Sequence, residues 1–296
     1  MALRIGIGLP FVDPTGRPHD AASLGDRARW IEELGFSGIW NGDASFRDLA
    51  TWPDPFLWMV VAAGATERVE LGFAALQLPL RHPVDNALRL FTLNALAGGR
   101  LAAGVAPGST RQGFDMMGMG DQFEARFKKF HADMDTIRAL GRGEQVGDAW
   151  LDPWEQWRPG PRYLLAAWAG GRMLERAVEE YDGWLCSAAR TTVGTIVEGL
   201  QRYRDLGGRR ALVASTQCDL TGRRRPMDED DPFNLVCSPT EAADRLHWLE
   251  ELGFDDVLVN VDDGRGLGPF KGDLARERLL ELRAVYEPAP AHTGER

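Results

Sequence analysis

The residues that most often do chemistry in α/β enzymes are sparse in this chain. The three lysines are Lys128, Lys129 and Lys271. None follows an expected strand, so Schiff-base catalysis lacks its nucleophile. Zinc hydrolysis needs clustered His and carboxylate ligands. The histidines fall on expected helices, in loops or in the tail, at positions 19, 82, 131, 247 and 292. We therefore expect no metal site.

Two aspartates are better placed for chemistry. Asp43 and Asp262 each follow an expected strand and could face each other as a carboxylate pair for hydrolysis. A cofactor-free hydrolase is one hypothesis that follows. A loop or helix-capping Asp explains each of them equally well, and nothing else in the chain selects this pair.

The other expected strand ends are small, apolar and rich in backbone groups. They read FAALQ, GVAPGS, AWAGGR and CSAAR. Such ends suit a flat organic cofactor held by backbone groups and stacking, because the cofactor then supplies the reactivity. The AGGR run opens a helix whose free N–H groups favour a phosphate, and SAARTT could add hydroxyls and a guanidinium. An ordinary turn would also explain the AGGR run, and a helix cap would also explain SAARTT.

These strand ends need eight strands and eight helices to position them. We expect strands at 4–9, 38–43, 69–78, 100–105, 162–168, 182–187, 210–219 and 256–261. Helices are expected at 20–34, 56–65, 83–97, 123–137, 170–180, 191–206, 238–252 and 273–286, and SPTE at 238–241 has capping-box spacing. The alternation predicts an α/β fold, a (β/α)8 TIM barrel. A Rossmann-like sheet is the alternative, weakened because no G-x-G-x-x-G follows an early strand. Residues 1–287 form one expected domain, and 288–296 an expected disordered tail.

The charge and the cysteine content of the chain indicate its cellular compartment and exclude some classes of partner. The net charge of −10 argues against nucleic acid or an anionic membrane as partner. Three cysteines without a C-x-x-C motif indicate a reducing cytoplasm and no disulfide framework. The first apolar run is too short for a signal segment or a membrane span. We expect a cytoplasmic protein.

Several stretches in order resemble the bacterial luciferase-like family of flavin- and deazaflavin-dependent oxidoreductases. They are RIGIGLP, ARWIEELGFSGIWNGD, ERVELGFAALQLPLRHP, LNALAGGRLAAGVAPG, a helix with Arg126 near its start, and YLLAAWAGGRMLERAVEEYDGWLCSA. The resemblance covers most of the chain. It implies a luciferase-like barrel with FMN as cofactor, or coenzyme F420 in some branches.

The resemblance also assigns cofactor-binding residues. Ala74 and Ala75 match a non-prolyl cis peptide that lies under the isoalloxazine ring in this family. Ala106, Pro107 and Gly108 would border the ring. The phosphate-binding positions correspond to Ala169, Gly170, Gly171 and Arg172, with Ser187, Ala188 and Arg190 beside them.

Two departures from the family pattern bear on the cofactor. Many members have His after the Asp that ends strand two, whereas Asp43 is followed by Ala44. The F420-dependent sugar-phosphate dehydrogenases carry a Glu near the position of Ser109. FMN is therefore favoured, with F420 as the alternative. The Arg- and Ala-rich, Lys-poor composition indicates a GC-rich genome, and an F420-making source would strengthen that alternative.

The leading hypothesis is an FMN-dependent monooxygenase that acts on a small organic substrate and receives reduced flavin from a separate reductase. Its candidate catalytic residues are Asp43, Arg111 and Arg126, although a structural ion pair explains Arg126 equally well. The alternatives are F420-dependent hydride transfer and a flavin-binding barrel without turnover.

Further expectations concern the substrate pocket and a partner. Long loops at 141–161 and 221–237 are expected to shape the pocket, with Trp52, Trp154, Trp157 and Trp168 as possible lining. The very apolar helix at 56–65 predicts a homodimer, unless a neighbouring loop shields it.

Overall fold

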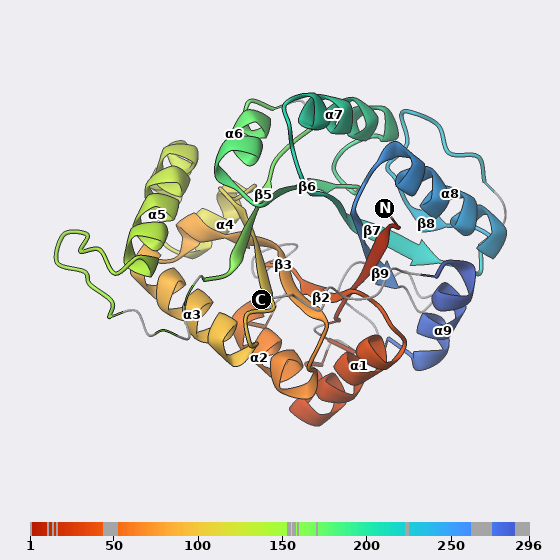
Figure 1. The fold of residues 1–296 in the computed structure, drawn as a ribbon, viewed down its shortest axis with the longest axis horizontal. Coiled ribbons are helices and arrows are strands. Elements are labelled where there is room, and N and C mark those ends of the chain that lie inside the picture. Colours follow the sequence, from red (N-terminus) through yellow and green to blue (C-terminus); the bar gives the residue numbers. More distant parts are fainter. Residues whose placement is uncertain are drawn as a thin grey trace.

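The β-strands of the computed structural model form one parallel sheet that closes on itself (Figure 1). The model describes residues 2–10, 12–13, 15, 17–43, 53–152, 155, 158, 160–169, 171–222, 225–261 and 274–287. Within them the strands are β1 (Arg4–Gly8), β2 (Gly38–Asn41), β3 (Glu70–Gln77), β4 (Leu101–Ala106), β5 (Arg162–Ala166), β6 (Gly183–Ser187), β7 (Ala211–Asp219), β8 (Leu235–Val236) and β9 (Asp256–Val261).

Barrel closure is explicit in the strand pairing. Each of β1 to β6 pairs in parallel with the next, β6 pairs with β7, β7 with β9, and β9 with β1. The predicted (β/α)8 barrel is confirmed, and the Rossmann-like alternative is wrong because an open sheet has two unpaired edges. The two-residue β8 was not expected. It lies against the end of β7, outside the ring of eight.

Helices surround the ring on its outer side (Figure 1). The described helices are α1 (Ala21–Glu33), α2 (Pro55–Ala65), α3 (Pro83–Leu96), α4 (Arg111–Met116), α5 (Arg126–Gly141), α6 (Met173–Glu180), α7 (Val193–Asp205), α8 (Pro239–Leu252) and α9 (Arg276–Val285), with short 3-10 turns η1 (Leu78–Leu80) and η2 (Gly120–Gln122). No helix among the described residues is both long and apolar enough to cross a bilayer.

Helix α4 was not among the helices expected from the sequence. Thr110 caps the helix by accepting a hydrogen bond from the Gly113 N–H, and Phe114 is fully buried beneath it. A cap and one buried aromatic therefore stabilise a helix too short to show a 3.6-residue period.

The capping box predicted at Ser238 is only half formed. The Ser238 side chain accepts a hydrogen bond from the Glu241 N–H, as expected. The Glu241 carboxylate instead accepts hydrogen bonds from the Arg225 N–H and from the Arg245 guanidinium. A strong cation one turn along α8 competes successfully for the carboxylate.

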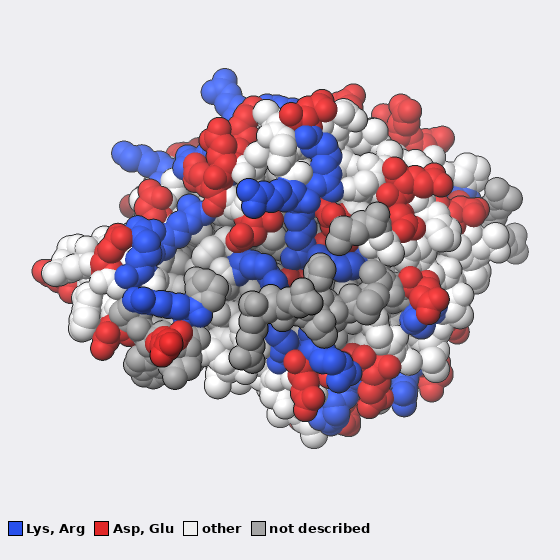
Figure 2. Space-filling model, in the orientation of Figure 1, with Lys and Arg blue, Asp and Glu red and all other residues white. Residues whose placement is uncertain are grey.

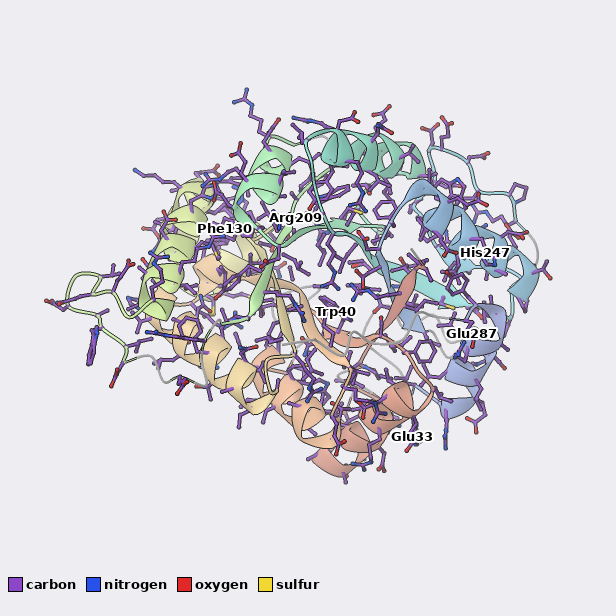
Figure 3. All side chains as sticks on the ribbon, viewed as in Figure 1. Glu33, Trp40, Phe130, Arg209, His247 and Glu287 are labelled. Carbon is purple, nitrogen blue, oxygen red and sulfur yellow. The ribbon has the colours of Figure 1, made fainter. Side chains whose placement is uncertain are left out.

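Trp40 fills the middle of the barrel (Figure 3). Its indole lies in space left by glycines on three strands: a Cβ atom would come within 2.6 Å of it at Gly6, 2.7 Å at Gly38 and 2.2 Å at Gly72. Leucines and alanines from other strands complete this interior cluster. The three glycines leave room for the large indole ring of Trp40, and the barrel interior is thus as closely packed as a protein core requires.

Charged side chains occupy the interior at the N-terminal end of the barrel. Arg210 donates to both carboxylate oxygens of Glu70, at 2.9 and 2.6 Å, and to both of Asp256, at 2.8 and 3.1 Å. Arg4 donates to Asp256 at 2.7 Å, and Arg162 to Glu70 at 2.8 Å. These five residues lie at or directly before the starts of β1, β3, β5, β7 and β9 and form one ion-pair network. Figure 2 shows Lys and Arg side chains, in blue, gathered near the centre of the face in view.

Candidate functional site

The C-terminal ends of the barrel strands form the candidate active site, since this end of a TIM barrel carries the chemistry. Ala74 and Ala166 lie there, partly buried and packed on the interior cluster. The peptide bond between Ala74 and Ala75 is cis, as the resemblance predicted. The pairing of β3 with β4 shifts register at this point, between Phe73 and Leu76.

Asp43 lies at the end of β2 and is bound to the end of β3. Its carboxylate accepts hydrogen bonds from Arg81 Nη1 at 2.6 Å and Nη2 at 3.2 Å, and from the Gln77 N–H at 3.1 Å. The Asp43 carbonyl accepts from Gln77 Nε2 at 2.7 Å. The Asp43 side chain has no exposed surface. The catalytic role expected for Asp43 stays a prediction.

Arg81 and Gln77 were not named among the sequence candidates. Burial alone would lower the pKa of Arg81, but the hydrogen bonds and the charge of Asp43 raise it above its ordinary value. The Arg81 guanidinium therefore carries its positive charge at any working pH. One sequence signal could have indicated Arg81. It is an Arg that closely follows a buried strand, next to a strand that is followed by Asp.

Arg111 and Arg126 both contact the aromatic ring of Phe123. Their guanidinium carbons are 5.0 and 4.1 Å from the centre of the Phe123 ring. Arg111 also donates to Glu124 at 2.6 Å, and Arg126 to the Phe123 carbonyl at 3.0 Å. Arg126 therefore does not need an ion pair to be held in place, because cation–π and backbone contacts hold it. The catalytic roles proposed for both remain predictions.

The predicted phosphate positions lie at the ends of the paired strands β5 and β6. Helix α6 starts at Met173, later than predicted, and its N-cap residue Arg172 makes no side-chain capping bond. The positive end of this helix is thus available to an anion. Arg172 and Arg190 are exposed there, and Ala169 and Ala188 are buried. Gly170 lies outside the described residues.

The end of β4 holds the remaining predicted cofactor positions. Ala106 and Pro107 are partly exposed, and Gly108 is buried. Gly108 has φ = +90°, and a Cβ atom there would be 2.8 Å from the Phe114 ring. Only glycine meets both conditions. This conformation turns the chain from β4 toward α4.

Asn260 has a buried polar atom at this end without a partner in the described part of the chain. Asn260 in β9 is 6% exposed, and its Nδ2 makes no hydrogen bond. Side chains alternate along a strand, so Asn260 points to the same side as Leu258, into the barrel. Small side chains and an unpaired donor are compatible with a planar cofactor or substrate that has acceptor atoms.

Trp52, Trp154, Trp157 and Asp262 lie outside the described residues. The Asp43–Asp262 pair therefore stays untested. Trp168 is described and is 64% exposed directly after β5. No group of three or more His, Cys, Asp or Glu within the described ranges could hold a metal ion.

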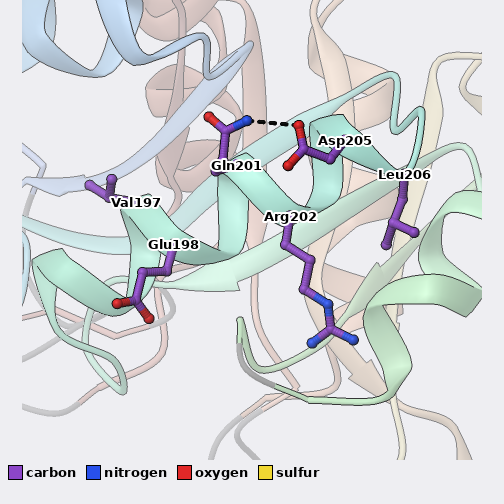
Figure 4. A pocket seen from close by; sticks show the side chains of 6 residues that line it. All are labelled: Val197, Glu198, Gln201, Arg202, Asp205 and Leu206. Carbon is purple, nitrogen blue, oxygen red and sulfur yellow. Dashed lines mark hydrogen bonds between the residues drawn. The ribbon is translucent and has the colours of Figure 1, made fainter.

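A shallow hollow of about 600 Å³ lies elsewhere, on the outer side of α7 (Figure 4). Its lining comes from a single helix, and Gln201 donates to Asp205 within it at 2.7 Å. The lining residues are Val197, Glu198, Gln201, Arg202, Asp205 and Leu206. It is outside the barrel wall and separate from the strand ends, so we do not regard it as the active site.

Comparison with known proteins identifies relatives of this geometry. The model of the family described as luciferase-like monooxygenase matches residues 4–218. The limonene 1,2-monooxygenase of Rhodococcus erythropolis is 33% identical over 116 residues, which is 39% of this chain and 30% of that protein. The chain thus spans less than a third of the length of this curated relative. A Mycobacterium tuberculosis protein described as uncharacterized is 26% identical over 252 residues, 82% of this chain and 80% of that protein.

Solved structures share the fold at lower identity. The oxygenating constituent of 3,6-diketocamphane monooxygenase from Pseudomonas putida, in complex with FMN, gives a TM-score of 0.73 at 16% identity and covers 98% of each chain. An F420-dependent secondary alcohol dehydrogenase gives 0.68 at 15% identity, covering 96% of this chain and 100% of that one. At these identities the likeness establishes the barrel alone.

Proposed function

The chain belongs to the luciferase-like monooxygenase family, and from this premise we propose that it is an FMN-dependent monooxygenase acting on a small organic substrate. The observation that carries the proposal is the strand-end surface of the barrel. Small residues and an uncapped helix N-terminus lie where a flat phosphate-bearing cofactor needs them. The named monooxygenase among its relatives supports the same reaction class.

In this proposal the phosphate of FMN binds at the start of α6. Gly171 and Arg172 precede the helix, and Ser187 and Arg190 stand at the end of the adjacent strand. The ring lies against Ala74–Ala75 and the 106–108 segment. Bound reduced flavin would supply the electrons and the activation of O2. The small apolar side chains around it exclude water from that chemistry.

The chain's own polar residues have a modest part in this mechanism. Asp43 has no His after it, and both of its carboxylate oxygens accept hydrogen bonds from Arg81. Arg111 and Arg126 remain the candidates for contact with substrate. Reduced FMN would come from a separate reductase.

Binding of FMN and riboflavin tests the assignment directly. Loss of two charged hydrogen bonds to phosphate, in the double variant Arg172→Gln, Arg190→Gln, should weaken FMN binding about a hundredfold or more, because each such bond contributes roughly 1.5–3 kcal/mol. Riboflavin lacks the phosphate, so its affinity should not change. Equal effects on both ligands would contradict the phosphate site.

Coenzyme F420 is the second candidate cofactor, because two F420-dependent enzymes share the fold. The visible absorbance of the purified, cofactor-loaded protein distinguishes the two. Oxygen uptake with reduced FMN and a panel of small ketones, aldehydes and alkenes then tests turnover. FMN binding without oxygen uptake on the whole panel would favour a non-catalytic flavin-binding barrel.

A homodimer through α2 is part of the proposal. Leu57 is 69% exposed and Val60, one turn later, 40% exposed, on a helix that otherwise buries Phe56 and Met59. Single exposed apolar residues are common, but two on one helix face suit a partner surface. Sedimentation at micromolar concentration should give a dimer for the wild type and a monomer for Leu57→Asp. A wild-type monomer would refute it.

A further inference from the structure

Asp43 connects the ends of two barrel strands through both its side chain and its backbone. Its carboxylate binds Arg81 through two bonds and accepts from the Gln77 N–H. Its carbonyl accepts from Gln77 Nε2. Its own N–H donates to the Ala75 carbonyl at 3.4 Å. One residue thus contacts positions 75, 77 and 81 of the segment that follows the middle of β3.

Arg81 completes this arrangement on the other side. Its side chain is 14% exposed, and its guanidinium carbon lies 5.8 Å from the centre of the Phe56 ring. Phe56 in turn packs on Phe73 at 5.1 Å between ring centres. Phe73 directly precedes Ala74. The ion pair is therefore linked to Ala75 through Asp43, and the aromatic pair is linked to Ala74 through Phe73.

The backbone around this peptide is also held from β4. A Cβ atom at Gly104 would lie 2.1 Å from the Phe73 carbonyl oxygen, so the two strands approach here more closely than any other residue allows. The position of Ala74 and Ala75 is thus set by contacts from Asp43 after β2, Gly104 in β4 and Arg81 after η1, and a group resting on them meets a fixed surface.

We propose that Arg81 and Asp43 are positioning residues that hold the Ala74–Ala75 segment in the place where the flavin ring rests. This inference depends on the proposed function for the identity of the ligand. The two residues act through the backbone and through Gln77. A bidentate Arg–carboxylate pair gives geometric specificity that Lys cannot reproduce, and pre-organised sites bind more tightly because less ordering is left to binding.

Two measurements on the free and flavin-bound protein test this. In Arg81→Gln, hydrogen exchange of the 75–77 amides should become faster in the free protein, because Asp43 loses the cation that fixes it. Affinity for FMN and for riboflavin should fall equally, about tenfold, since the ring surface and not the phosphate site is affected. Arg81→Lys should recover only part of both losses.

Arg89→Gln is the matched control. Arg89 also lies over the Phe56 ring, at 5.6 Å, but its ion pairs are with Asp85 and Asp54 on α3 and before α2. Exchange at 75–77 and flavin affinity should both stay at wild-type values. If Arg81→Gln fails to fold, the isosteric Asp43→Asn replaces it, with the same expected effects.

Different outcomes separate this inference from the proposed function. Wild-type protein that binds neither FMN nor riboflavin would refute the function, while faster 75–77 exchange in Arg81→Gln would still show the positioning. Unchanged exchange in both Arg81→Gln and Asp43→Asn would overturn the inference. So would an FMN affinity loss that riboflavin does not share.

Discussion

Glu70 should make the stability of this barrel depend on pH in a defined window. Burial alone would raise the pKa of Glu70, but Arg210, Arg162 and Arg4 lower it from an ordinary 4.5 to about 2. A carboxyl group whose pKa is lower in the folded state stabilises the fold above its unfolded pKa. That stabilisation is complete above about pH 5 and is lost as the pH falls from about 4.5 to about 2.

The size of the effect follows from the same shift. Linkage converts it to about 3 kcal/mol at neutral pH. Substitution of Glu70 by Gln removes this contribution and also leaves Arg210 and Arg162 without one of their partners. Removing one partner of a buried ion pair costs about 3–5 kcal/mol. The free energy of unfolding of Glu70→Gln at neutral pH should therefore be lower by about that amount.

Urea unfolding followed by tryptophan fluorescence measures both effects, at neutral pH and at steps down to about pH 3. The wild type should lose stability on acidification, and Glu70→Gln should show a shallower loss because its contribution is already absent. Glu144→Gln is the control, since its carboxylate is exposed and pairs with the exposed Arg142. Equal midpoints for Glu70→Gln and wild type, or parallel pH profiles, would refute the reasoning.

Three other predictions concern packing, thiol reactivity and the unpaired amide. Gly72→Ala should destabilise the protein by about 1–3 kcal/mol in urea unfolding because its Cβ meets Trp40, whereas Gly64→Ala, with open space around it, should be neutral or slightly stabilising. The three free cysteines are buried, and burial raises the pKa of Cys186, so a thiol reagent at neutral pH should label none of them before unfolding; labelling at the rate of a free thiol would contradict this. Asn260→Leu should raise the unfolding free energy by about 1 kcal/mol without ligand and weaken flavin or substrate binding, and a loss of stability would show that the amide is satisfied.

The sequence predicted the barrel well because its signal repeats. Each of the eight barrel strands is a short apolar run with a helix after it, and their bounds differ from those observed by only a few residues. The unexpected helix α4 and strand β8 are too short to repeat any pattern. Their formation depends on burial of Phe114 and Leu235 against the rest of the fold.

Backbone features of the site could be predicted from the sequence, whereas the pairing of its side chains could not. The cis peptide at Ala74–Ala75 follows from the family resemblance, and the local sequence predicts a helix after β5, although α6 starts at Met173 and not at the expected position 170. The pairing of Asp43 with Arg81 joins residues 38 positions apart, and no spacing rule indicates it. A sequence reveals which groups are available, whereas their partners depend on which strands become neighbours.

The contact between β1 and β9 has a consequence for synthesis of the chain on the ribosome. Arg4 and Asp256 bind each other across 252 positions, so the first strand leaves the ribosome long before its neighbour exists. Until then β1 has one open edge, and such edges invite pairing with other chains. Translation that stalls before residue 256 should thus yield an insoluble product, and release of the last strand should coincide with acquisition of protease resistance.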